Sequence, residues 1–177
     1  MRRRTSIVSV VAAVLAVSGV GTSAGAVAEP RANAMQQLQA GVFAELNATR
    51  QQHGLTPLRS SARLAAAAKE HSVEMATRGY FSHNSANGTS FDRRIVRYYP
   101  IGRYRYWSVG ENLLWSSPDV DPGGALHMWM NSPEHRANIL NARWRQIGIS
   151  AVHVDAAPGM FGGDPVTVIT TDFGVRR

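Results

Sequence analysis

The chain has 177 residues, a formal net charge of +7 and no cysteine. The absence of cysteine excludes a disulfide framework, a thiolate metal site, a cysteine nucleophile and a lipid-modified N-terminal cysteine. Three of the basic residues stand at positions 2–4, so the remaining charge is modest; it does not point to a nucleic-acid binder, but it favours attraction to anionic cell-wall polymers or lipid head groups.

The first 28 residues have the pattern of an export signal. Arginines at positions 2–4 precede an almost wholly apolar run over residues 7–20, and small residues follow. The apolar run is shorter than the roughly 20 residues that a bilayer crossing needs. We therefore predict a signal peptide over residues 1–28, cut after Ala28 or after Ala26. An uncleaved anchor is the alternative, and the paired arginines leave twin-arginine export open.

The chain that remains begins with patterns typical of helices. Apolar residues recur at helical spacing over residues 35–53, and a glycine follows as a stop. A second helix is predicted over residues 61–78, and a short third one begins near residue 91, after a loop with an Asn-Gly turn. His71 shares the apolar face of the second helix, so we expect a core histidine there rather than a ligand.

The second half of the chain alternates strand and helix patterns. A strand is predicted over residues 108–115 and a helix over residues 122–131. Two strands rich in β-branched residues follow, over residues 145–154 and 165–174, with a hairpin loop between them. Helices first and strands last, joined by short links, predict an α+β fold with an antiparallel sheet.

A further short helix is predicted in the segment NSPEHRANIL. Ser132 has the residue type of an N-cap, and Pro133 suits the first helical position, where its missing N–H costs nothing. If Ser132 caps the helix, its replacement by alanine costs on the order of 1 kcal/mol. The cap fixes His135 in the first turn.

Three residues stand out as candidates for chemistry: His83, Glu111 and His135. Two imidazoles and a carboxylate form a sensible ligand set for a divalent metal such as zinc, and they equally suit general acid–base work. Their spacings are long, unlike the H-E-x-x-H pattern that places two ligands on one helix face. By spacing alone, three unrelated polar residues at the ends of elements remain the simpler interpretation.

Six segments occur in one order that is similar to a known family: LNATRQQHGLTPL, LAAAAKEHSVEMA, FSHN, GENLLW, WMNSPEHRANILN and IGISAV. Together they resemble the CAP superfamily (cysteine-rich secretory proteins, antigen 5 and pathogenesis-related protein 1), whose domain is also called SCP. The resemblance is closest to its short, exported bacterial members. It predicts a CAP domain over residues 40–177, after an N-terminal lead-in at residues 29–39.

The resemblance implies a three-layer α-β-α sandwich with a central antiparallel sheet. It also implies a cleft with two histidines and acidic residues, where family members hold divalent metals. By motif, these positions fall on His83, Glu111 and His135, and zinc is the metal we expect first.

The chain also departs from the family pattern. Longer members carry a second cleft glutamate in a W-x-x-E motif, where this chain has Ser132, and some bacterial relatives have an aspartate shortly after the first histidine, where it has Asn84-Ser85. Glu134 is expected to point away from the cleft. Fewer charged ligands imply weaker metal binding, so a hydrogen bond between histidine and glutamate without metal is the alternative.

Arginines and aromatic residues alternate over residues 93–107. Such a segment can hold an anionic glycan, peptidoglycan or a lipid surface, but a solvated loop whose rings pack partly into the core is the favoured interpretation. Ser82 and Asp172 do not indicate a serine hydrolase, because no G-x-S-x-G elbow is present.

Two classes of function follow. The first is a secreted, extracellular or cell-wall-associated binding protein whose cleft, with or without metal, recognises a lipid, glycan or peptide. The second is a metal-dependent hydrolase in which His83 and His135 hold the metal and Glu111 acts as a ligand or base. We expect no stable membrane span after signal cleavage, and the sequence leaves catalysis and the oligomeric state open.

Overall fold

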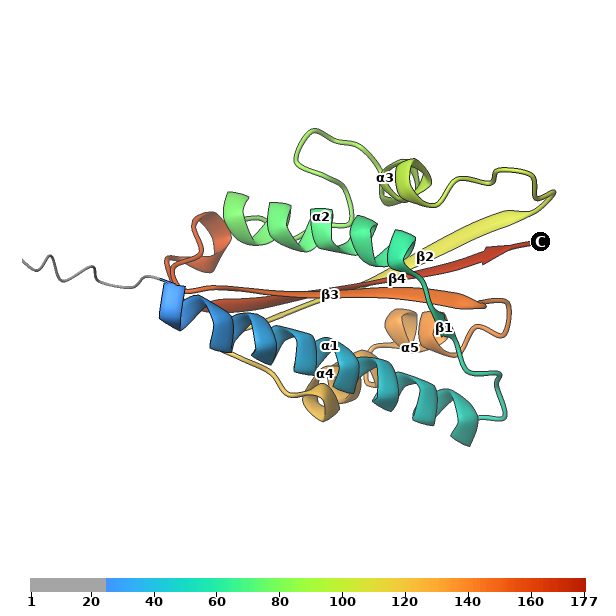
Figure 1. Cartoon of the computed structure of the whole chain (residues 1–177), viewed down its shortest axis with the longest axis horizontal. Coiled ribbons are helices and arrows are strands. Elements are labelled where there is room, and N and C mark those ends of the chain that lie inside the picture. The colour runs from blue at the N-terminus through green and yellow to red at the C-terminus, as the bar shows by residue number, and fades with distance from the viewer. Residues whose placement is uncertain (1–24) are drawn as a thin grey trace, which may run out of the picture.

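The computed structural model describes residues 25–177 and has three layers, with helices on both faces of one sheet (Figure 1). The sheet has the order β1-β3-β4-β2, built from β1 (Arg59–Ser60), β2 (Trp107–Ser116), β3 (Gln146–Val154) and β4 (Val166–Arg176). The three long strands pair antiparallel, and the two-residue β1 pairs parallel with β3. The predicted α+β sandwich is confirmed, and β1, which is too short to leave a pattern, was not predicted.

The helices divide between the two faces. In Figure 1, α2 (Ala62–Arg78) and α3 (Phe91–Tyr98) lie on one face, and α1 (Gly25–Gln52), α4 (Pro122–Met130) and α5 (Pro133–Ile139) lie on the other. A 3-10 turn, η1 (Gly159–Phe161), lies in the predicted hairpin loop between β3 and β4. None of the helices within residues 25–177 is long and apolar enough to cross a bilayer.

Helix α2 begins and ends as predicted because both ends carry sequence signals. The Ser61 side chain accepts a hydrogen bond from the N–H of Leu64, and Gly79 ends the helix in the left-handed conformation, with φ of 69°. The helix lies directly on β3 at Gly148, where a Cβ atom would stand 2.0 Å from the backbone nitrogen of Ala65. Glycine at this position is what allows the layer to pack so closely.

Helix α1 begins at Gly25, ten residues before the predicted start. The apolar spacing begins only where the helix reaches the core, at Met35 and Leu38, and the preceding residues 30–34 are exposed, so they carry no periodic pattern. Residues 1–24 of the predicted signal peptide lie outside the part of the chain that the structure describes.

The predicted start of α5 at Ser132 and Pro133 is confirmed, but the predicted capping hydrogen bond is not formed. Ser132 has the extended backbone of an N-cap residue, but its side chain makes no capping hydrogen bond. Helix α4 shows the contrast, because Asp121 Oδ1 accepts a hydrogen bond from the N–H of Gly124 at 2.7 Å. His135 is therefore held by other contacts.

Candidate functional site

Glu111 lies in β2, the strand at the end of the sheet, and its side chain is buried. The preceding Gly110 leaves room for the side chains of Asn138 and Trp144. A Cβ atom at Gly110 would stand 2.7 Å from Asn138 Oδ1 and 2.8 Å from the Trp144 ring. Asn138 of α5 uses this space to donate hydrogen bonds to the carbonyl of Glu111 at 3.1 Å and to Asn112 Oδ1 at 2.9 Å. The glycine before the glutamate thus lets α5 dock against the strand.

Arg94 joins Glu111 to the loop that carries the first histidine. Its guanidinium forms an ion pair with Glu111 Oε2, and neither side chain is exposed. The same guanidinium donates to the carbonyl of His83 at 3.1 Å and to Ser85 Oγ at 3.2 Å. Sequence reasoning did not single out Arg94, which stands among several arginines in a short segment.

His83 contacts Glu111 directly. Its Nδ1 lies 2.8 Å from Glu111 Oε1, and the side chain is 52% exposed. Because a carboxylate only accepts hydrogen bonds, Nδ1–H is the donor when the ring is neutral, and Nε2 is left for another partner.

His135 lies in the first turn of α5, and its backbone carbonyl accepts a hydrogen bond from Asn112 Nδ2 at 3.1 Å. Burial lowers the pKa of its imidazole, the neighbouring His83 lowers it further, and the carboxylate of Glu134 opposes both. The partly buried ring is thus biased toward the neutral form, which both donates and accepts a hydrogen bond.

The three predicted side chains line one open cleft with a volume of about 350 Å³, at the small end of ligand pockets. The loop that carries His83 follows α2, while His135 belongs to α5, so the two histidines come from opposite helical layers and meet at the edge of the sheet. Beside them, the lining consists of Asn112, Glu134, Ala137, Asn138 and Asn141. The expectation that Glu134 points away is wrong, because this residue lines the cleft.

Two further ionisable groups lie under the cleft. Asp172 of β4 is the cross-strand neighbour of Glu111; its side chain is fully buried, and neither carboxyl oxygen has a hydrogen-bond partner. Burial raises the pKa of Asp172 well above its usual range, and the neighbouring Glu111 carboxylate raises it further. The protonated form is therefore the one that this position favours.

His71 is a core histidine, as predicted. Its ring is fully buried, and Nε2–H donates to the carbonyl of Ser82 at 2.8 Å. Burial is the main reason that the pKa of His71 is lowered. Together with Arg94, this histidine holds the loop that carries His83 from beneath.

The metal-ligand expectation can be tested against these contacts. Both oxygens of Glu111 are engaged, one by His83 and one by Arg94. Over residues 25–177, no group of three or more histidine, aspartate or glutamate side chains is arranged to hold a metal ion. The residues therefore do not form a complete ligand set in this arrangement, and metal binding at His83, Glu111 and His135 stays a prediction.

The arginine–aromatic segment packs against the C-terminus. The Arg176 guanidinium lies 3.8 Å from the centre of the buried Tyr99 ring and 5.2 Å from that of Tyr104, and Arg177 lies 4.9 Å from that of Tyr106. The protein's own arginines occupy these ring faces. The favoured interpretation, a surface segment with rings packed partly into the core, agrees with these contacts.

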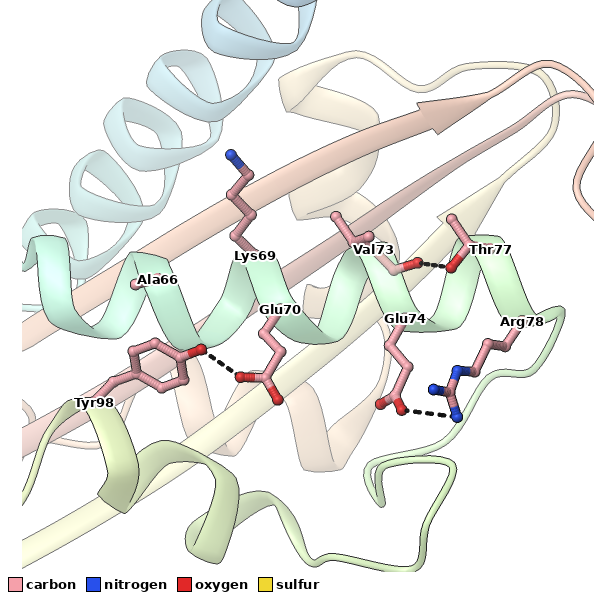
Figure 2. A pocket seen from close by; sticks show the side chains of 8 residues that line it. All are labelled: Ala66, Lys69, Glu70, Val73, Glu74, Thr77, Arg78 and Tyr98. Carbon is pink, nitrogen blue, oxygen red and sulfur yellow. Dashed lines mark hydrogen bonds and ion pairs between the residues drawn. The ribbon is translucent and has the colours of Figure 1, made fainter.

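A larger hollow of about 610 Å³ lies along the outer side of α2 (Figure 2). Its carboxylates are paired locally: Glu70 with Arg97 and Tyr98, and Glu74 with Arg78 and Tyr80. No imidazole is among the described residues that line it. Size alone therefore does not make it the better candidate.

Comparison with known proteins agrees with this geometry. The model of the cysteine-rich secretory protein family, CAP, matches residues 43–164. Protein YkwD of Bacillus subtilis (strain 168) is 36% identical over 107 residues, which is 60% of this chain and 39% of YkwD. The chain therefore corresponds to well under half the length of that relative.

Solved structures show the same fold. An extracellular protein containing a SCP domain from Bacillus anthracis str. Ames has a TM-score of 0.59 at 27% identity, over 81% of this chain and 43% of that one. An outer surface protein from Borrelia burgdorferi has a TM-score of 0.59 at 19% identity, over 77% of this chain and 90% of that one.

Proposed function

Because the chain belongs to the cysteine-rich secretory protein (CAP) family, we propose that it is an exported binding protein whose cleft recognises a peptide, glycan or lipid through His83, His135 and the amides beside them. The observation that carries the proposal is that two histidines, one from the loop after α2 and one from α5, line one open cleft. Export is supported by the pattern of residues 1–28 and by the extracellular SCP-domain protein of similar structure.

The donor and acceptor groups of the cleft support recognition by hydrogen bonding. Imidazole, carboxamide and carboxylate groups line it, so a ligand with both N–H and C=O groups is matched there. The buried ion pair with Arg94 holds Glu111, and Glu111 in turn orients His83. A ligand group that meets a prearranged imidazole loses less entropy on binding, which favours affinity.

The alternative is a hydrolase. The hydrogen bond from His83 to Glu111 is the observation that favours it, because an imidazole oriented by a carboxylate suits a general base. A zinc ion at His83 and His135 would supply an activated water, and Glu111 could join it as a ligand only by giving up a present partner.

Binding assays separate these functions. The probes are soluble peptidoglycan fragments, a peptide library and phosphatidylglycerol vesicles, each tested with and without EDTA. We expect binding of one probe class to survive EDTA and to be weakened in both His83→Ala and His135→Ala, whereas His127→Ala, a change at an exposed histidine outside the cleft, leaves it unchanged. Binding that the two cleft variants do not alter would contradict the proposal.

Zinc calorimetry and turnover assays on peptide, ester and glycan substrates address the alternative. Turnover that requires zinc and disappears in both His83→Ala and His135→Ala would identify the protein as a metal-dependent hydrolase. If the zinc affinity is the same in the wild type and both variants, His83 and His135 are not zinc ligands and the metal prediction is wrong.

A further inference from the structure

An apolar hollow of about 240 Å³ adjoins the cleft; we call it the apolar slot. It is lined by apolar side chains of β2, of α4 and of the loop after α2, together with two residues at the start of α5: Phe81, Leu113, Leu114, Trp115, Met128, Trp129, Ser132 and His135. Of these side chains, Met128 is 49% exposed and Trp115 is 36% exposed. The slot thus presents apolar surface that the described part of the protein does not cover.

The slot and the cleft share His135. A ligand that contacts this imidazole from the cleft therefore has an apolar hollow directly beside it. Ser132, which also lines the slot, makes no capping hydrogen bond to α5. One histidine stands between a polar half and an apolar half of a single composite site.

The strand beneath the slot is the edge of the sheet. β2 pairs with β4 on one side, and no strand within residues 25–177 pairs with its other side. There, the carbonyls of Glu111 and Leu113 accept hydrogen bonds from Asn138 and from the Trp129 indole. Because these two carbonyls are already bonded within the protein, the edge offers no free main-chain acceptor at Glu111 or Leu113, and an extended ligand has to bond to the imidazole, carboxamide and carboxylate groups of the cleft.

We propose that the apolar slot takes one large apolar side chain of an extended peptide whose main chain crosses the cleft between His83 and His135. The polar half of the site matches peptide N–H and C=O groups, and the slot matches a leucine, methionine or phenylalanine side chain. This inference rests on the proposed function, because it names which of the three ligand classes the cleft binds and why. A glycan strand has no large apolar group to fill the slot, and a lipid held in a bilayer presents its head group while its acyl chains stay within the membrane.

A pooled library of acetylated, amidated hexapeptides, equilibrated with the protein and analysed by mass spectrometry, tests the inference. We expect the enriched peptides to share leucine, methionine or phenylalanine at one position, and an alanine there to weaken binding roughly 10-fold or more in fluorescence anisotropy. No enrichment, or enrichment without an apolar position, overturns the inference.

Matched variants separate the slot from the cleft. Met128→Lys places a charge at the slot and is expected to abolish the preference for the apolar side chain. Met160→Lys, at a methionine that is 51% exposed and outside the slot, is expected to keep that preference. His83→Ala is expected to weaken all peptides alike and to leave the preference intact, since His83 lines the cleft and not the slot.

The outcomes distinguish a failure of the apolar slot from a failure of the binding cleft. If Met128→Lys keeps the preference for an apolar side chain, the slot does not bind that side chain and the inference is overturned. The proposed function is still supported in that case if His83→Ala and His135→Ala weaken binding. Binding only to phosphatidylglycerol vesicles, or only to glycan strands freed of peptide, also overturns the inference and keeps the cleft as a binding site. All variants are first compared by thermal melting to confirm that they fold.

Discussion

Replacing Arg94 by methionine removes the one cation that is in contact with the buried Glu111 among the described arginines and lysines. The two side chains form an ion pair without solvent exposure, and Asp172 lies across from Glu111 on β4. Arg94→Met leaves the buried Glu111 carboxylate with His83 as its remaining partner and without a permanent cation, and it also frees the carbonyl of His83. Breaking a buried ion pair by removing one partner costs about 3–5 kcal/mol of unfolding free energy.

The expected change in melting temperature is large. For a domain of this size, a loss of about 1 kcal/mol lowers the melting temperature by about 2–4 °C, so Arg94→Met is expected to melt roughly 6–20 °C below the wild type. Scanning calorimetry measures the shift. Arg93→Met is the matched control, since this neighbouring arginine is exposed, and it is expected to change the unfolding free energy by less than about 0.5 kcal/mol.

A double variant tests the reason behind that loss. Adding Glu111→Gln to Arg94→Met removes the buried charge that has lost its arginine partner, so the double variant is expected to be more stable than the sum of the two single losses implies. The idea that a buried charge pair supports the cleft is refuted if Arg94→Met and Arg93→Met have the same melting temperature. It is also refuted if the losses of unfolding free energy in the double-mutant cycle are strictly additive.

Two other stability predictions concern helix α5 and His71. Ser132→Ala is expected to change the unfolding free energy in urea by less than about 0.5 kcal/mol, whereas Asp121→Ala, which removes the real cap of α4, is expected to cost about 1 kcal/mol; equal losses would contradict the contrast between the two caps. Because burial lowers the pKa of His71, the folded state binds fewer protons than the unfolded state, whose histidine titrates near 6.5. The stability that depends on neutral His71 is therefore present above about pH 6.5 and is lost as the pH falls through the folded pKa. The urea midpoint is expected to fall more steeply on acidification in the wild type than in His71→Gln, and parallel pH profiles would count against this explanation.

The boundaries that the sequence predicts well are those with local chemical signals. Ser61 and Gly79 bound α2, and β-branched runs mark β3 and β4 to within a residue or two. The start of α1 was missed because residues 30–34, which precede its first core residues, are exposed. Ser132 shows the opposite error: residue type and backbone conformation match a cap, but the hydroxyl does not form the bond.

The site could be predicted only in part. The family resemblance named His83, Glu111 and His135, which line one cleft, although their spacing alone did not bring them together. Arg94 could not be distinguished from the exposed arginines beside it, because only the packing of α3 against β2 buries it. Asp172 was considered only for a serine triad, and its place across from Glu111 depends on strand register, which a sequence pattern does not specify.

The two cleft histidines differ in how they are anchored. His135 belongs to a helix that is docked on β2 by Asn112 and Asn138, whereas His83 lies in a loop that reaches β2 through Glu111 and Arg94. Substitutions and changes of length in that loop can therefore alter one wall of the cleft while the sheet and its helices keep their packing. Diversification among relatives is expected to concentrate there, so that one scaffold serves different ligands by exchanging a single wall.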